Sequence, residues 1–387
     1  MKKLVLSLAL LATIFTGCTS DNDETPTPIV PVVGEITGDL TTNKTFAYGT
    51  YSLKGIVKIQ SGVTITFDAG SKITSDATNG VDALVVLNGG KLIMNGTAAE
   101  PIVMTEISAT PGSWGGIIMY GDAPIVGAAG VTTANSEDGL ALPYGGTNAT
   151  HNGGSLKYVR IEYAGKKITD GTSEMNGFSF YSVGSGTTLE NLVSYKGADD
   201  GFEFYGGTVS LKNAISYGNF DDSFDWQDGW RGQESTNWYA YQTVTGNFGM
   251  EIECKSFNNA FFPKVTNITL KREAGTATEN ASIEYDAIQF KKEGNGDYSN
   301  VLIDGYSATG AVAVRIQDAA TNTNQVNGSK IKLTNIKING TTVESGSGSS
   351  AFSVVFPANM FVTSSTATGA SLTTGAWSTV GNVNLIR

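Results

Sequence analysis

The sequence predicts an all-β protein in which short parallel strands wind into a single solenoid, and three observations support this. Forty-eight glycines and nine prolines in 387 residues indicate many tight turns, and a hydrophobic content of 40% can supply a large core. From Tyr51 onward, short runs of β-favouring residues alternate with glycine, and no 12-residue window keeps the 3.6-residue period of a helix. The third observation is an internal repeat.

The repeat joins two segments at a constant offset of 22 residues: "NLVSYKGADDGFEFYGG" from Asn191 and "NAISYGNFDDSFDWQDG" from Asn213. Periods in the twenties are typical of stacked repeats. Looser copies of the first half begin at Leu156, Leu189, Leu211, Val265, Tyr298 and Leu333. Strands are kept while turns vary in length, so we expect successive coils to pair along the solenoid axis, with Phe202 directly beside Phe224.

The N-terminal residues carry targeting signals. Lys2 and Lys3 precede a short apolar run, too short for a membrane-spanning helix of roughly 20 residues, so residues 1–17 are predicted to be a signal peptide. "FTGC" resembles a bacterial lipoprotein signal, which implies lipidation of Cys18 and an outer-membrane anchor. The following "TSDNDE" resembles the surface-export signal of Bacteroidetes lipoproteins, which implies display on the extracellular side.

The rest of the chain is predicted to be a tether and one domain. Residues 18–33 are acidic and then rich in Thr and Pro, which is typical of a flexible tether, and residues 34–387 form a single domain with its end caps. Residues 121–155 are an inserted loop that we expect to drape over a groove or edge of the coil. We read residues 345–387 as the last strands and a cap over the open end.

The single thiol outside the lipidation site has a structural interpretation. With Cys18 lipidated, Cys254 lacks a partner for an internal disulfide. It alternates with Met250 and Ile252, which predicts a buried strand residue.

The formal charge of −11 argues against nucleic acid as a partner, because phosphate binding needs clustered Lys and Arg. The acidity favours a metal ion or a cationic partner, or it serves solubility alone.

Stacked coils would force the repeated acids together. Neighbouring strands lie about 4.8 Å apart, and two like charges at that distance repel by about 3.5 kcal/mol at an effective dielectric of 20. A divalent cation would offset this repulsion, and calcium fits best because it accepts six to eight oxygen ligands in irregular geometry. The alternative is that these acids cap their own turns or point into water. The candidate metal ligands are Asp199, Asp200, Glu203, Asp221, Asp222, Asp225 and Asp228.

Aromatic residues around the second acidic copy suggest a second kind of site. In "DWQDGWRGQESTNWYAY", the rings of Trp230, Trp238 and Tyr239 could stack on sugars while Arg231 binds hydroxyl groups. This predicts a platform for a polysaccharide ligand. The alternative is that Trp226 belongs to the core and that Trp230 covers the edge of a coil.

Several segments carry a family resemblance: "IQSGVTITFDAGSKI", "LVVLNGGKLIMNGTAAEPIVMTE", "GSWGGIIMYGDAPI" and "DDGFEFYGGTVSLKNAISYGNFDDSFDWQDGWRG". They resemble the right-handed parallel β-helix proteins, and more narrowly a group of Bacteroidetes surface lipoproteins of that fold. The likeness extends from about Leu53 to about Gly340. It implies a fold and a location but no chemistry.

Three functions are compatible with these features. The first is a cell-surface lipoprotein that binds an extracellular glycan or other nutrient, with a TonB-dependent transporter as partner. The second is a polysaccharide lyase or glycoside hydrolase of the pectinase-like β-helix type, with Arg231, Lys255 or Arg315 as the base of a calcium-dependent lyase. The Gly-His-Gly motif of the pectin hydrolases is missing, and the single histidine, His151, is expected to be a solvated loop residue. The third is a structural or adhesive surface protein.

Overall fold

The computed structural model describes residues 30–75, 78, 80–127, 131–168, 173–255, 262–340 and 343–387. The predicted signal peptide, Cys18 and most of the tether therefore lie outside the described residues. Pro31–Arg387 form one compact unit. Among the described residues, no helix is long and apolar enough to cross a membrane.

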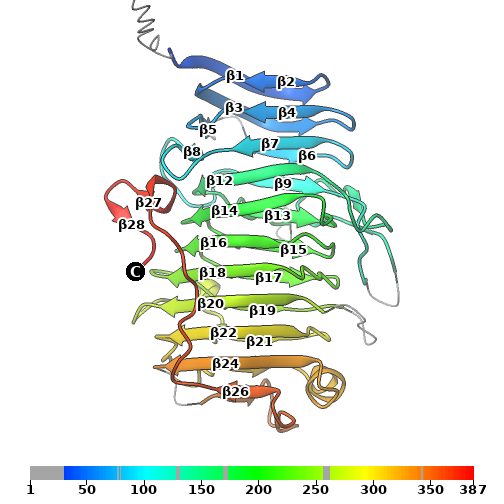
Figure 1. The fold of residues 1–387 in the computed structure, drawn as a ribbon, viewed down its shortest axis with the longest axis vertical. Coiled ribbons are helices and arrows are strands. Elements are labelled where there is room, and N and C mark those ends of the chain that lie inside the picture. Colours follow the sequence, from blue (N-terminus) through cyan, green and yellow to red (C-terminus); the bar gives the residue numbers. More distant parts are fainter. Residues whose placement is uncertain are drawn as a thin grey trace, which may run out of the picture. The chain divides into compact units, whose positions relative to one another are not determined.

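Pro31–Arg387 wind into a parallel β-helix, which confirms the predicted all-β solenoid (Figure 1). Its coils form three parallel sheets, here named A, B and C. Sheet A continues from the second half of β3 (Gly49–Ile59) through nine short strands. These are β6 (Ala83–Val86), β9 (Ile117–Tyr120), β13 (Phe178–Tyr181), β15 (Phe202–Tyr205), β17 (Phe224–Gln227), β19 (Met250–Ile252), β21 (Ile288–Phe290), β23 (Val314–Ile316) and β25 (Ser345–Ser347).

Sheets B and C begin as separate strands and then share long ones. Sheet B starts with β2 (Lys44–Phe46), β4 (Thr64–Phe67) and β7 (Lys91–Asn95), and sheet C with β1 (Val32–Leu40), the first half of β3, β5 (Lys72–Ser75) and β8 (Ile102–Glu106). From β12 onward, the first half of each long strand belongs to B and the second half to C. These strands are β12 (Gly154–Glu162), β14 (Thr188–Tyr195), β16 (Leu211–Tyr217), β18 (Ser235–Gln242), β20 (Lys264–Arg272), β22 (Gly296–Asp304) and β24 (Ile331–Asn339).

The bend between sheets B and C explains the asparagine of the repeat. Asn191, Asn213 and Asn237 have φ of 57°, 59° and 57°, a left-handed conformation that asparagine adopts more readily than most residues. The side-chain amide of Asn213 donates to Asn191 at 3.1 Å, and that of Asn237 donates to Asn213 at 2.9 Å. The repeated asparagine therefore makes each turn and also links it to the previous coil.

The 22-residue register is confirmed in the core. Phe202 pairs with Phe224 across adjacent parallel strands, and their ring centroids lie 5.4 Å apart. Phe178 continues this stack at 5.0 Å from Phe202. Cys254 is buried, as predicted, but it lies beyond the end of β19 and not in a strand. Each buried aromatic ring removes 150–250 Å² from water, so this aromatic column is a main source of cohesion between coils.

The insertion packs on the outer face of sheet A, whereas the sequence led us to expect a groove or an edge of the coil. Ile125 and Tyr144 pack against the outward rings of Tyr120, Tyr181 and Tyr205. The insertion carries the short strands β10 (Ala134–Asn135) and β11 (Pro143–Tyr144). The expectation of a solvated histidine is wrong, because His151 is 4% exposed in this segment.

The last segment differs in part from the predicted cap. β26 (Phe361–Thr363) extends the sheets, and Phe352, Phe356 and Phe361 pack against the end of the core. The chain then runs back along the side of the coil (Figure 1, red), where β27 (Thr379–Val380) and β28 (Val383–Asn384) form a small hairpin. Trp377 and Leu385 bury the outer surface of sheet C. Only the first part of residues 345–387 therefore closes the end.

Candidate functional site

A row of acidic side chains lies on the outer face of sheet A. Because side chains alternate along a strand, the inward positions of β15, β17 and β19 hold core residues and the middle outward positions hold Glu203, Asp225 and Glu251. Glu203 pairs with Asp225, and Asp225 pairs with Glu251, in the register of the parallel ladder. Three carboxylates are therefore stacked on consecutive coils.

The turns before these strands add the paired aspartates. Asp200 Oδ1 accepts a hydrogen bond from the backbone N–H of Asp222 at 2.8 Å, and Asp222 Oδ1 accepts one from Phe248 at 2.6 Å. One oxygen of each aspartate thus binds the backbone of the next coil. The alternative that these acids cap their own turns does not describe these two bonds, because each bond joins one coil to the next. The second oxygen of each of these two carboxylates is left for other contacts.

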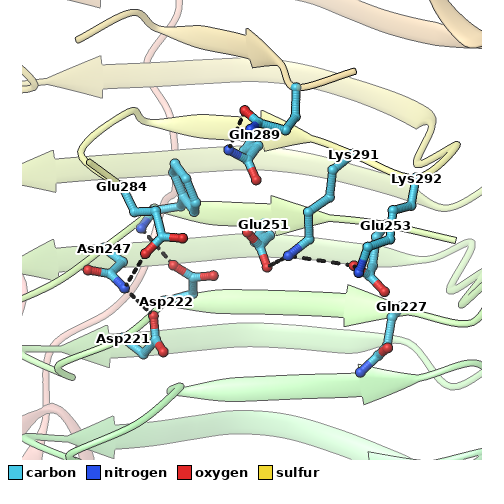
Figure 2. Close-up of polar contacts among 12 residues, drawn as sticks. Asp221, Asp222, Gln227, Asn247, Glu251, Glu253, Glu284, Gln289, Lys291 and Lys292 are labelled. Carbon is cyan, nitrogen blue, oxygen red and sulfur yellow. Dashed lines mark hydrogen bonds and ion pairs between the residues drawn. The ribbon is translucent and has the colours of Figure 1, made fainter. Parts of the chain in front are cut away.

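These side chains line a cavity of about 380 Å³, here called the acidic pocket. Figure 2 shows part of its wall, with Asp221 and Asp222 at one end and Glu251 and Glu253 beside the two lysines. Eleven acids and three lysines contribute, together with Asn176, Tyr205 and Gln227. The acids are Glu137, Glu174, Asp199, Asp200, Glu203, Asp221, Asp222, Asp225, Glu251, Glu253 and Glu284, and the lysines are Lys255, Lys291 and Lys292.

The pocket contains six of the seven carboxylates that the repeat singled out as metal ligands. Asp228 lies outside its lining: its carboxylate accepts a hydrogen bond from the Tyr144 hydroxyl at 2.5 Å and lies 3.7 Å from the Lys255 ammonium. The backbone at Asp228 has a positive φ of 55°, which ends the regular alternation of β17. Asp228 therefore fixes the insertion to sheet A.

Sequence reasoning missed five of the acids. Glu251 and Glu253 lie one coil after Asp225, but the offset from Asp225 to Glu251 is 26 residues, so the 22-residue comparison passes over them. The alternation of apolar and acidic residues in "MEIE" was the sequence signal that could have revealed these two acids. Glu137 comes from the insertion and Glu174 from the long connection after β12, and contacts of that kind carry no local sequence pattern.

The pocket has two electrostatically different halves. In one half, Lys291 forms ion pairs with Glu251 and, at 3.5 Å, with Glu253, and Lys292 lies 2.8 Å from Glu253. The other half, here called the unpaired half, consists of six carboxylates. Within the described part of the chain, none of these six forms an ion pair with a lysine or arginine. They are Asp199, Asp200, Glu203, Asp221, Asp222 and Asp225.

Carboxylate oxygens in the unpaired half approach one another closely. One oxygen each of Asp200, Glu203 and Asp225 lie within 4.8 Å of one another, and Asp222 and Asp225 form a similar group with Glu251 of the lysine-paired half. Asp199 is 2% exposed, and its Oδ2 has no hydrogen-bond partner; Asp225 Oδ1 is likewise buried without one. A buried carboxylate oxygen without a donor is costly, so these two atoms call for a cation or a proton.

When no cation is bound, the carboxyl groups of the unpaired half are neutralised by protons. Burial, followed by the nearby Glu137 carboxylate, raises the pKa of Glu203 to about 8. Burial, followed by Glu279 and Glu251, raises the pKa of Asp221 to about 7. Burial and the neighbouring acids also hold the pKa values of Asp200 and Asp225 well above the usual range. The unpaired half therefore retains protons near neutral pH.

The three candidate bases lie in different places. Lys255 lines the acidic pocket; burial opposes its charge, but Asp228 and Glu253 raise its pKa, so it stays protonated at neutral pH. Arg315 binds Asp286 through two contacts of 2.7 and 3.0 Å. Arg231 lines a separate pocket. None of the three is poised to accept a proton in the acidic pocket.

The predicted aromatic platform is wrong. Trp230 is 1% and Trp238 is 0% exposed, so neither indole face is open to a sugar. The indole N–H groups of these residues donate to the backbone carbonyls of Val209 and Leu211 at 2.9 and 3.0 Å. Tyr239 is also buried. Trp226 is a core residue, as the alternative interpretation held, and Trp230 and Trp238 also lie in the core, so Trp230 does not cover the edge of a coil. Tyr239 lies on the outer face of sheet C under the C-terminal segment.

Comparison with known proteins fits this architecture. No curated protein matches the chain. A model of the pectate-lyase-like β-helix domain matches residues 34–380, which is most of the described solenoid. The chain therefore belongs to the pectate-lyase-like β-helix family.

Proposed function

We propose that the protein is a cell-surface lipoprotein that captures an extracellular glycan through divalent cations held in the acidic pocket. The observation that carries the proposal is the unpaired half: six acids on two consecutive coils, none of which forms an ion pair with a described lysine or arginine. A coil whose register stacks like charges gains stability when a cation binds between them. The stability of the two coils would then depend in part on the bound cation.

Calcium is the cation that suits these ligands. Carboxylates are hard oxygen ligands, and calcium accepts six to eight of them in flexible geometry, whereas magnesium requires a near-ideal octahedron. Asp200, Glu203 and Asp225 would hold one ion, and Asp222, Asp225 and Glu251 a second one that shares Asp225. Binding requires deprotonated ligands, so calcium would displace the protons that burial holds in the pocket.

The ligand would complete the coordination of the ion. Sugar hydroxyl and carboxylate oxygens are of the type that calcium accepts, and they could fill the positions that protein oxygens leave open. The signal around Cys18 supports an outer-membrane anchor, and capture of a nutrient at that surface gives a TonB-dependent transporter as partner.

The first test is thermal unfolding of the purified full-length chain in detergent, in EDTA and with millimolar calcium or magnesium. A ligand of the folded state stabilises it by mass action, so calcium should raise the Tm more than magnesium does. Asp225→Asn should abolish the calcium shift, whereas Glu190→Gln, outside the acidic pocket, should keep it. An unchanged Tm in calcium, or a shift that survives Asp225→Asn, would overturn the cation part of the proposal.

Polysaccharide cleavage is the second candidate, and Glu203 favours it. A carboxyl group with a pKa of about 8 keeps its proton at neutral pH, as the general acid of a glycosidase must. Incubation with neutral and uronic-acid polysaccharides separates the two functions. Release of reducing ends or of unsaturated uronides that is lost in Glu203→Gln would establish catalysis, and calcium-dependent binding without products would support capture alone.

A further inference from the structure

A second and larger cavity, of about 720 Å³, lies away from the acidic pocket and is here called the flank pocket. It is formed where the chain turns after β13, β15 and β17, so each of three consecutive coils contributes an equivalent piece of wall. Its volume is within the range of small-molecule sites. The wall residues from successive coils include Ser185 and Thr187, then Thr208 and Ser210, then Arg231 and Gln233.

The insertion closes one side of the flank pocket. The backbone carbonyl of Ala149 accepts hydrogen bonds from the hydroxyls of Ser185, at 3.0 Å, and Thr208, at 2.5 Å. The Thr187 hydroxyl accepts the backbone N–H of Gly153 at 2.8 Å. Hydrogen bonds between the insertion and the turns after β13 and β15 therefore fix this side of the flank pocket.

Charge distinguishes this pocket from the acidic one. Two acids, Glu190 and Glu234, are balanced by Lys212 and Arg231 among its lining residues. The Lys212 ammonium lies 3.0 Å from Glu234, and Glu190 pairs with Lys157 at 3.2 Å. With no net charge and its ions largely paired, the pocket does not favour a polyanion or a polycation. It favours a ligand that is rich in hydrogen-bonding groups and uncharged.

The remaining lining supplies what a sugar ring needs. Hydroxyl groups of Thr188 and Ser210 can exchange hydrogen bonds with sugar hydroxyls, and the half-buried Phe262 offers an apolar ring surface. Equivalent wall positions repeat about every 4.8 Å along the axis. A repeating wall suits a linear ligand that itself repeats.

We propose that the flank pocket binds a linear, uncharged oligosaccharide. The proposal rests on the proposed function only in taking a glycan as the ligand, and the lining residues of the two pockets do not overlap. The proposed sugar site still uses residues of "DWQDGWRGQESTNWYAY", but not the aromatic residues that the sequence suggested. The indoles of that stretch are inside the core, whereas Arg231, Gln233 and Glu234 lie at the surface pocket.

The test is calorimetric titration of the full-length chain in detergent with EDTA present, so that calcium-dependent binding is silent. The probes are the neutral hexasaccharides of glucose, xylose, mannose and galactose, with oligogalacturonate as the charged counterpart. We expect at least one neutral probe to bind and oligogalacturonate not to bind. Arg231→Ala and Phe262→Ala should each weaken binding tenfold or more without changing the Tm.

Matched controls make the result specific. Two variants should leave affinity for the neutral probe unchanged. One is Lys332→Ala, which removes a surface lysine of β24 that pairs with Asp297 of β22, and the other is Asp225→Asn in the acidic pocket. Binding to none of the four neutral probes, undiminished binding in both flank variants, or a requirement for calcium would overturn the proposal. The calcium-dependent Tm shift is measured in a separate experiment. Its absence would overturn the cation site in the acidic pocket and would leave the oligosaccharide site in the flank pocket unaffected.

Discussion

Asp225 lies directly beside Glu203 in the parallel ladder of sheet A, and neither carboxylate has a lysine or arginine ion-pair partner in the described part of the chain. Two like charges at the spacing of adjacent strands repel by about 3.5 kcal/mol at an effective dielectric of 20. A proton or a cation between the two groups removes this repulsion.

Removal of one charge should stabilise the metal-free protein. Asp225→Asn keeps the size of the side chain and removes a carboxyl group that must either hold a proton or repel Glu203 and Glu251, so the free energy of unfolding in EDTA should rise by on the order of 1 kcal/mol. Urea unfolding at pH 8 measures this. Glu190→Gln serves as the control and should change stability little, since exposed ion pairs contribute about 0–1 kcal/mol. A less stable Asp225→Asn protein would contradict the repulsion argument.

The stability of the metal-free protein should fall as pH rises from about 5 to about 8. The folded-state pKa values of Glu203, about 8, and Asp221, about 7, exceed those of the unfolded chain, near 4. Between these values the folded state binds more protons than the unfolded state, so each unit of pH removes stability. Urea unfolding in EDTA at several pH values tests this expectation, and a stability that rises over the range would refute it.

Calcium should reverse part of that trend. Because calcium must displace protons from the ligands, the Tm increase that it causes should be small at pH 5 and larger at pH 8. Paired thermal scans with calcium and with EDTA at each pH give the difference. An increase that is independent of pH would mean that the ion binds somewhere other than the protonated carboxylates.

The asparagine bend between sheets B and C should tolerate glycine better than alanine. Asn213→Ala loses the hydrogen bonds to Asn191 and Asn237 and puts alanine at a φ of 59°, which together should cost about 2–3 kcal/mol. Asn213→Gly relieves the backbone strain and loses only the hydrogen bonds. Chemical unfolding of both variants gives the comparison; equal losses would show that the backbone conformation does not matter.

The buried indoles should affect stability and not sugar binding directly. Trp238→Ala would open a cavity in the aromatic column beside Phe224, whose ring centroid is 4.5 Å away, and should lower the free energy of unfolding by about 3–5 kcal/mol. Acrylamide should quench tryptophan fluorescence weakly, with or without sugar. Strong quenching that sugar suppresses would instead place indoles at the ligand.

The sequence was sufficient to predict the coil and most of the acidic cluster, because one local rule determines both. Side chains alternate along a strand and equal offsets stack, so Phe202 with Phe224 and Glu203 with Asp225 follow from a single alignment. The rule fails where the length of a coil changes. Glu251 pairs with Asp225 at an offset of 26 residues, so an alignment at 22 residues does not detect it.

The rule also fails after a turn that breaks alternation. Asp228 and Gly229, with φ of 55° and 69°, redirect the chain so that Trp230 points into the core. Contacts made by the insertion, such as Tyr144 with Asp228, join residues 84 apart in sequence and have no local signature. Non-local packing of this kind also buried His151.

The returning C-terminal segment acts as a longitudinal tie across the windings. Asn300 on β22 contacts the backbone carbonyl of Gly369 at 3.2 Å, Asn237 on β18 accepts the N–H of Ser371 at 3.3 Å, and Arg160 on β12 reaches the carbonyl of Thr379 at 3.0 Å. An untied repeat protein can fray one winding at a time from either end. A strap fastened at several heights makes the loss of any one winding cost contacts at the others, so the tied windings should melt as one cooperative block.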